Sequence, residues 1–182
     1  MRFVVHAILF TIVAGLTHIA SIFLIPYLTH RDIYSRLEAG APVNQLAAID
    51  NDDLKSFPFA DTNLAVAVCR YDLATGPLRL RVPLSETFLV LALAERRSGI
   101  YSSVSDRAAT GGMLDVVVAT APQLDRIARL DDEDQAVEEI RVAAPSLKGL
   151  AILKVFIDRP SSREKAEALL RRAQCESEAL PN

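Results

Sequence analysis

The amino-acid sequence predicts a mainly β domain, sandwich-like and antiparallel, with an N-terminal transmembrane helix and a C-terminal helix. Three observations predict it. Residues 3–28 contain no charged side chain, and residues 63–120 alternate short apolar runs with turn residues. Residues 161–173 combine a helix-capping pattern with apolar side chains at helical spacing. Few helices, and no alternation of strands with helices, favour an antiparallel sandwich or a barrel-like domain.

Composition places the chain among folded proteins and excludes one class of partner. Of its 182 residues, 51% are hydrophobic and 24% are charged, as in globular domains. The part after the apolar stretch is the right size for one domain with a hydrophobic core. Lys and Arg number 20 against 23 Asp and Glu, and they form no basic cluster. Because nucleic-acid affinity depends on neutralising phosphates, we predict no nucleic-acid partner.

The first element is the apolar stretch, residues 3–28. At about 1.5 Å of rise per residue, a helix of this length exceeds the roughly 30 Å hydrocarbon core of a bilayer. The apolar region of a cleaved signal peptide is shorter, and His18 disrupts the candidate cleavage site that ends at Ala20. We therefore predict a retained single-pass anchor, residues 1–29, that contacts the lipid bilayer through residues 3–28.

The side of the membrane follows less directly from the sequence. Few basic residues flank the span, so the positive-inside rule decides little. A lone N-terminal anchor followed by a long globular domain usually exports that domain. We therefore predict an inner (cytoplasmic) membrane protein whose domain is periplasmic.

A helical juxtamembrane linker is predicted over residues 30–60. A short helix leaves the membrane and breaks at Gly40-Ala41-Pro42, which is a turn-forming sequence. A second short helix is predicted over residues 43–49. The triplet Phe57-Pro58-Phe59 closes the linker.

The β-rich domain is predicted over residues 61–182. Strands are expected at residues 64–69, 78–82, 88–94, 100–104, 113–119, 137–142 and 150–157, with one helix at residues 122–129. The last helix starts after Pro160 with a Ser161-x-x-Glu164 capping box. Its buried face is expected to consist of Ala166, Leu169, Leu170 and Ala173.

Cys69 and Cys175 are the only cysteines. In an exported domain they could form one disulfide, closing a loop of about 107 residues and stabilising the fold by on the order of 4 to 5 kcal/mol. The alternative is two separate thiols, with Cys69 buried on a Val-rich strand. The spacing of the two residues leaves both open.

Catalytic and metal sites are tested residue by residue. His30 is the only histidine after the anchor, which argues against a His-based triad or a His-rich metal site. Ser162-x-x-Lys165 has the spacing of a nucleophilic serine beside a lysine, but the companion motifs are missing. The acidic run at residues 131–134 lacks the alternating ligand spacing of a calcium loop. We predict no catalytic residue, no metal and no cofactor.

Asp61, Thr62 and Asp72 are the candidate binding residues. Asp61 and Asp72 could form an acid–base pair on neighbouring strand ends. They could equally act as turn and cap residues that bind nearby backbone N–H groups.

Residues 61–107 resemble the bacterial family of the domain of unknown function 1254 (DUF1254). The resemblance is carried by Asp61-Thr62, Tyr71-Asp72-Leu73, Gly76-Pro77 and Val82-Pro83. Residues 18–37 are similar to the anchor of short membrane-bound members found in alphaproteobacteria. The resemblance implies a β sandwich, export in Gram-negative bacteria and frequent pairing with a second domain, DUF1214. That domain is absent here, so a separately encoded DUF1214-like protein is the expected partner.

Two functions remain open. The favoured one is a non-enzymatic, membrane-anchored binding or interaction module of the cell envelope that works with the DUF1214-like partner. The alternative is a carboxylate-dependent hydrolase or modifying enzyme that acts on an envelope polymer or lipid through residues such as Asp61 and Asp72.

Overall fold

The computed structural model describes residues 2–28, 38, 40–50, 61–96, 98–131 and 138–179. The chain divides into two compact units, Met1–Arg36 and Leu37–Asn182. The predictions for His30, for the helix leaving the membrane, for Phe57-Pro58-Phe59 and for residues 132–134 lie outside the described residues.

The first unit contains helix α1 (Arg2–Leu28), which confirms the predicted apolar N-terminal helix. Its segment Arg2–Ile25, 24 residues, is long and apolar enough to cross a membrane, a property that signal sequences share. Polar side chains in this helix bond to its own backbone: Thr11 donates to the carbonyl of Ala7 at 3.0 Å and Thr17 to that of Val13 at 2.9 Å. These two hydroxyls therefore need no second helix to be satisfied.

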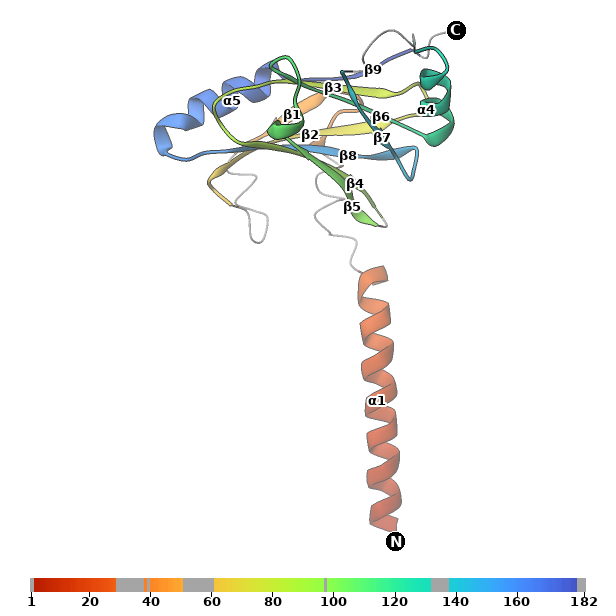
Figure 1. Ribbon diagram of the computed structural model, residues 1–182. Helices are drawn as coiled ribbons and strands as arrows, with labels where there is room; N and C mark the ends of the chain where they lie inside the picture. The colour runs from red at the N-terminus through yellow and green to blue at the C-terminus, as the bar shows by residue number, and fades with distance from the viewer. Residues whose placement is uncertain are drawn as a thin grey trace. The chain divides into compact units, whose positions relative to one another are not determined.

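In the part of the second unit that the structure describes, most residues belong to strands, and α4 and α5 are short α-helices (Figure 1). In chain order its elements are β1 (Leu46–Ile49), β2 (Leu64–Asp72), β3 (Leu78–Pro83), β4 (Leu89–Glu95), β5 (Gly99–Ser105), η1 (Asp106–Ala108), β6 (Met113–Ala119), α4 (Ala121–Ala128), β7 (Ile140–Ala143), β8 (Lys148–Phe156), η2 (Pro160–Ser162), α5 (Arg163–Arg172) and β9 (Gln174–Ser177).

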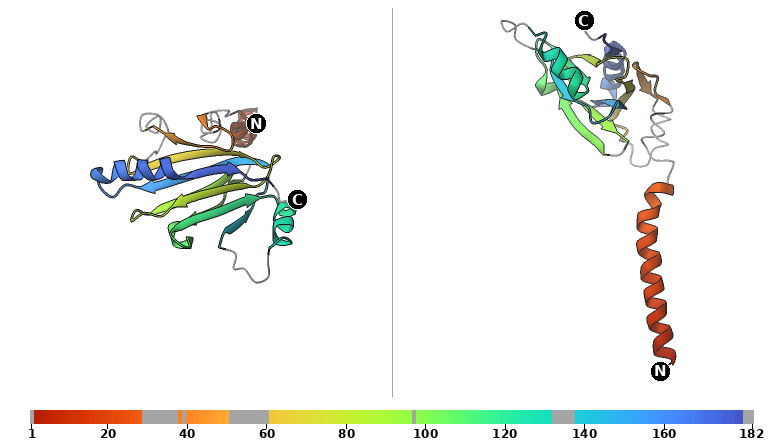
Figure 2. Two further views of the ribbon diagram at one scale, coloured as in Figure 1. Left: turned by 90° about the horizontal axis from the view of Figure 1, so that it is seen from above. Right: turned by 90° about the vertical axis from the view of Figure 1, so that its right-hand side faces the viewer.

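The strands form two sheets that pack face to face (Figure 2). One sheet has five strands in the order β1-β2-β8-β4-β5, and the other has four in the order β7-β6-β3-β9. Every neighbouring pair is antiparallel except β6 and β7. The predicted mainly β, sandwich-like fold is confirmed.

The core lies between the two sheets and follows from the alternation of side chains along each strand. In β3, Leu78, Leu80 and Val82 are buried while Arg79 and Arg81 are half-buried on the outer face. Helix α5 covers one side of the sandwich, where it packs against β2, β3 and β8. Its buried side chains are Ala166, Leu169 and Leu170, as its apolar spacing predicts.

A disulfide crosses this core. The sulfur atoms of Cys69 on β2 and Cys175 on β9 are 1.98 Å apart, with a Cα–Cα distance of 6.6 Å. Both residues are buried. The bond ties the five-stranded sheet to an edge strand of the four-stranded sheet.

The helix predicted over residues 43–49 is wrong. Leu46–Ile49 form β1, which pairs antiparallel with residues 66–69 of β2. A helix of one or two turns is marginal alone, whereas a short apolar run gains backbone partners by extending an existing sheet. The folded unit therefore includes residues upstream of the predicted boundary at Asp61.

Two strand assignments also differ from the prediction. β7 pairs parallel to β6, because α4 and the segment after it provide the long crossover that parallel strands require. β9 was not predicted. It has one buried apolar residue, Cys175, and becomes a strand by pairing with β3.

The capping box predicted at α5 is also wrong. Ser161 lies in the 3-10 turn η2, and the Ser162 hydroxyl donates to the carboxylate of Asp158. A capping arrangement forms at α4 instead, where the Thr120 backbone N–H donates to Oε1 of Gln123 at 2.9 Å.

Candidate functional site

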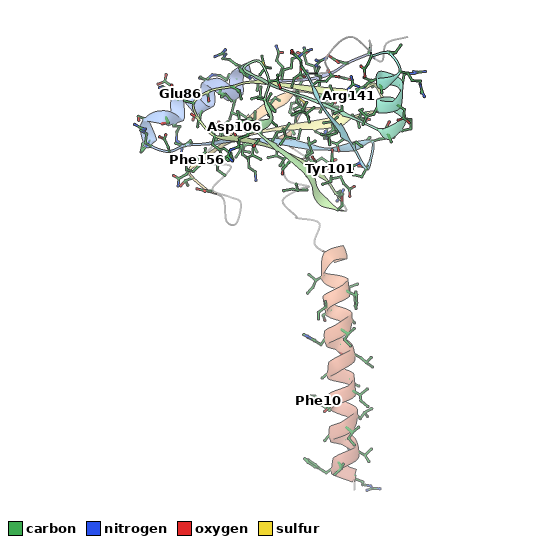
Figure 3. All side chains as sticks on the ribbon, in the orientation of Figure 1. Phe10, Glu86, Tyr101, Asp106, Arg141 and Phe156 are labelled. Atoms are coloured by element: carbon green, nitrogen blue, oxygen red, sulfur yellow. A yellow bond between two sulfur atoms is a disulfide. The ribbon has the colours of Figure 1, made fainter. Side chains whose placement is uncertain are left out.

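A groove of about 760 Å³ opens at the end of the sandwich where β4 begins, β8 ends and α5 starts. Its walls are residues 85–88 of the loop before β4, Phe156 at the end of β8, and residues 158, 159, 161, 162 and 165 around the start of α5. Figure 3 shows Glu86 and Phe156 at this end of the β unit, away from Tyr101 and Arg141. The volume lies in the range of small-molecule sites.

Two phenylalanines form the apolar part of the groove. Leu89 of β4 pairs with Val155 of β8, so the next residues outward, Phe88 and Phe156, lie opposite each other. The Phe156 N–H donates to the Phe88 carbonyl at 2.9 Å, which extends the ladder to this pair. Directly opposed residues point to the same face of a sheet. The side chains are 49% and 42% exposed, and they therefore form an apolar platform open to solvent.

Asp158 is the most constrained polar group in the groove. Its carboxylate accepts hydrogen bonds from the Ser162 hydroxyl and from Nε of Arg159, the latter at 2.9 Å. These bonds hold the pKa of Asp158 below its ordinary range, and the bond from Ser162 has the larger effect. Asp158 is therefore ionised at neutral pH and poorly suited to donate a proton.

The Ser162-x-x-Lys165 pair lies in the same groove. A nucleophilic serine must give its proton to a base such as the lysine. Here the Ser162 hydroxyl donates to Asp158, whose low pKa makes it a weak base. The arrangement matches a structural role for Ser162 in ordering the start of α5.

Asp61 and Thr62 lie at the same end of the sandwich as the groove. Asp61 precedes β2, whose first residue, Leu64, pairs with Phe156. Oδ1 of Asp61 accepts a hydrogen bond from the Asn63 N–H at 2.8 Å. The carbonyl oxygen of Thr62 accepts one from Nη2 of Arg163 at 2.7 Å. Asp61 thus makes the turn contact expected of an aspartate before a strand.

Asp72 lies at the far end of the same strand. β2 is 9 residues long, and at about 3.3 Å per residue it separates Asp61 from Asp72 by roughly 25 Å. The predicted proximity of these carboxylates is wrong, because they flank one strand instead of ending two neighbouring strands. Oδ1 of Asp72 accepts the Ala74 N–H at 3.0 Å, and Oδ2 lies 3.4 Å from Nζ of Lys148. That Asp61 and Asp72 each take part in binding stays a prediction.

A second polar cluster covers the outer face of the four-stranded sheet. Nη2 of Arg79 lies 2.7 Å from Oδ2 of Asp115 and 3.0 Å from Oε2 of Glu139. Nη1 of Arg79 lies 3.2 Å from Oε1 of Glu178. These contacts connect β3 to β6, to the residue before β7 and to the residue after β9, so the cluster holds the strands of this sheet together.

The acidic run at residues 131–134 is described only at Asp131. Oδ1 of Asp131 accepts Nη2 of Arg141 at 2.7 Å, and this bond lowers the pKa of Asp131. Among the residues that the structure describes, no group of three or more His, Cys, Asp or Glu side chains is placed to hold a metal ion.

Acid is expected to destabilise the fold. The pKa values of Asp72, Asp131 and Asp158 all lie below their ordinary 3.8 through hydrogen bonds made in the folded state. The unfolded chain therefore binds more protons at acid pH, and this stabilisation is lost as the pH falls from about 5 towards the folded-state pKa values. Thermal unfolding of the detergent-solubilised chain, followed by circular dichroism, should show a falling midpoint in this range. A midpoint unchanged from pH 7 to about 3 would contradict the assignment.

Sequence reasoning missed Phe88 and Phe156 as site residues. It placed both in apolar strands, where phenylalanine is expected in the core. Only the register between β4 and β8 shows that the two side chains lie opposite each other and outside the core.

The structure thus defines a class of protein, a two-sheet β sandwich with a solvent-open groove at one end and an apolar helix before it. A family model described as "Protein of unknown function (DUF1254)" matches residues 43–177. The chain belongs to this family.

A solved structure from Vibrio parahaemolyticus shares the fold. The VPA0106 protein from Vibrio parahaemolyticus is similar with a TM-score of 0.54 at 14% identity, over 77% of this chain and 31% of that one. An uncharacterized protein from Burkholderia cenocepacia has a TM-score of 0.47 at 17% identity, over 70% and 35% of the two chains. This chain thus spans about a third of the length of each of these structures. No curated protein matches it.

Proposed function

We propose that this protein is a non-enzymatic binding domain of the cell envelope, held at the inner membrane by α1, with its β unit on the periplasmic side. The β unit captures a ligand in the groove beside Phe88 and Phe156. A separately encoded DUF1214-like protein works with it.

The groove is the observation that carries the proposal. Burying apolar surface is favourable, so two adjacent phenylalanines left 49% and 42% exposed form a surface suited to a ligand. The polar groups around them are supplied by loops and by the first turn of α5, while β4 and β8 fix the platform. Binding sites commonly combine a rigid apolar surface with a few polar groups in this way.

Binding is favoured over catalysis because the candidate carboxylates are already paired. Asp158 accepts bonds from Ser162 and Arg159, Asp72 from the Ala74 N–H, and Asp61 from the Asn63 N–H. Asp61 and Asp72, which the hydrolase alternative relied on, cannot act on one bond across roughly 25 Å.

The partner is proposed from the family. The chain belongs to the DUF1254 family, and the resemblance to that family implies frequent pairing with a DUF1214 domain.

Co-purification from detergent tests this proposal against the hydrolase. The full chain is expected to retain a DUF1214-like protein in a stoichiometric complex, and the Asp61→Ala/Asp72→Ala double variant is expected to retain it equally well. If the folded double variant instead loses turnover of envelope material that the natural chain carries out, the domain is an enzyme. Absence of any complex with the natural chain would remove the partner from the proposal.

A further inference from the structure

We infer that the groove beside Phe88 and Phe156 binds an uncharged saccharide chain, with the apolar faces of its pyranose rings lying on the two phenylalanine rings. This inference rests on the proposed binding function and names its ligand class. It follows from the shape of the platform, the charge balance of the walls and the hydrogen-bonding groups that surround the rings.

The platform favours a ligand with a broad apolar face. Phe88 and Phe156 are held side by side by the pairing of β4 with β8, which continues through the bond between their backbones. A pyranose ring presents its C–H bonds on its faces and its hydroxyls at its edge. Such a ring can therefore bury apolar surface on the phenylalanines while its hydroxyls stay available to polar partners.

The charges of the walls favour a neutral ligand. Among the wall residues that the structure describes, the carboxylates of Glu86 and Asp158 are balanced by the cations of Arg159 and Lys165. A phosphate or another strongly charged ligand would meet both attraction and repulsion, and would gain little net Coulomb energy. A ligand rich in hydroxyls can donate to the carboxylates and accept from the cations at the same time.

The polar groups are partly ordered before any ligand arrives. Asp158 is oriented by Ser162 and Arg159, and an ionised carboxylate has about four acceptor sites, so it retains capacity for ligand hydroxyls. The Ser85 hydroxyl accepts the Thr87 N–H at 3.2 Å, which shapes the loop before β4. Ordering of this kind lowers the entropic cost of binding.

A lipid acyl chain fits these observations less well. It would cover the phenylalanines but would remove water from Glu86, from Lys165 and from the paired Asp158 and Arg159 without offering them a hydrogen bond, which is costly for charged groups. Of the ligand classes compared, the saccharide is the one that matches both the apolar platform and the polar walls.

Titration of the full chain tests the inference. The chain should be held in a zwitterionic detergent without a sugar head group, and ligand binding should be measured by saturation-transfer NMR and calorimetry. The probes are a β-1,4-linked glucose tetramer, an N-acetylglucosamine tetramer, a galacturonate tetramer, decanoate and inorganic phosphate. Glucose and an alkyl glucoside are compared in the same detergent, with Phe88→Ala as the control for uptake of the alkyl chain by the micelles. Tighter binding of the alkyl glucoside than of glucose, weakened by Phe88→Ala, assigns the saccharide to a glycolipid instead of a free chain.

We expect the neutral tetramers to bind with a Kd of about 1 mM or tighter, and Phe88→Ala or Phe156→Ala to weaken binding roughly tenfold. Ile100→Ser is the matched control, because Ile100 is 60% exposed and pairs with Ala94 near the opposite end of β4. Circular dichroism should show all three variants folded, since the truncated side chains lie outside the buried core and are 42% to 60% exposed.

The inference is overturned if no neutral saccharide binds, or if both phenylalanine variants bind it as well as the Ile100→Ser control does. Preferred binding of decanoate, phosphate or galacturonate would overturn the ligand class and leave the proposed binding function standing. Loss of the DUF1214-like complex, in contrast, would affect the proposed function without changing the saccharide titration.

Discussion

Replacing Cys69 and Cys175 together by alanine is expected to lower the free energy of unfolding by about 4 to 5 kcal/mol. The disulfide joins residues 106 positions apart and ties β2 of one sheet to β9 of the other. Without it the unfolded chain gains the freedom of a long loop, and β9 keeps only its pairing with β3. Because domains of this size are stable by only about 5 to 15 kcal/mol, the loss is a large share of the total. Urea unfolding of the detergent-solubilised chain, followed by circular dichroism, measures it.

The oxidised chain supplies the control for this prediction. Its intact mass under non-reducing conditions should be lower by two hydrogen atoms than after reduction. Reduction of the natural chain should bring its unfolding midpoint close to that of the double variant. Equal midpoints for the oxidised natural chain and the double variant would show that the bond adds no stability.

Gly149→Ala is expected to destabilise the fold by about 3 kcal/mol. A Cβ at Gly149 would lie 2.2 Å from the Tyr71 hydroxyl oxygen and 2.6 Å from the Ala94 carbonyl oxygen. Tyr71 is fully buried and its hydroxyl lies 3.0 Å from that of Tyr101, so it cannot move aside without losing this bond. The Ala94 carbonyl belongs to a central strand of the five-stranded sheet. The unfolding midpoint of the variant in urea measures the effect.

Gly40→Ala is the matched control for Gly149. A Cβ at Gly40 would meet nothing within 4 Å, so the same chemical change should leave stability unchanged or slightly raised. If Gly149→Ala unfolds at the same urea concentration as the natural chain, β2 and β8 are not packed as closely as described.

The fold was predictable from the sequence where local patterns dominate. Alternation along Leu78–Pro83 and the apolar run Met113–Ala119 correctly predicted β3 and β6. The failures lie where tertiary pairing decides. Leu46–Ile49 and Gln174–Ser177 are too short to carry a period of their own, and each is a strand because a neighbour offers it backbone partners.

The candidate site was less predictable than the fold. Single residues such as Asp61 and Asp72 are found by their chemistry, but their separation depends on the length of β2. The pairing of Phe88 with Phe156 joins residues far apart in the chain and depends on register, which local sequence does not specify.

Reporter fusions after Leu28 and at the C-terminus test the central claim, that α1 anchors an exported binding domain, most directly. A reporter that is active only after export, such as alkaline phosphatase, is expected to be active at both positions, with the fusion proteins retained in the membrane fraction. Activity at both positions of a reporter that works only in the cytoplasm would contradict the claim, because it would place the β unit and its groove on the other side of the membrane.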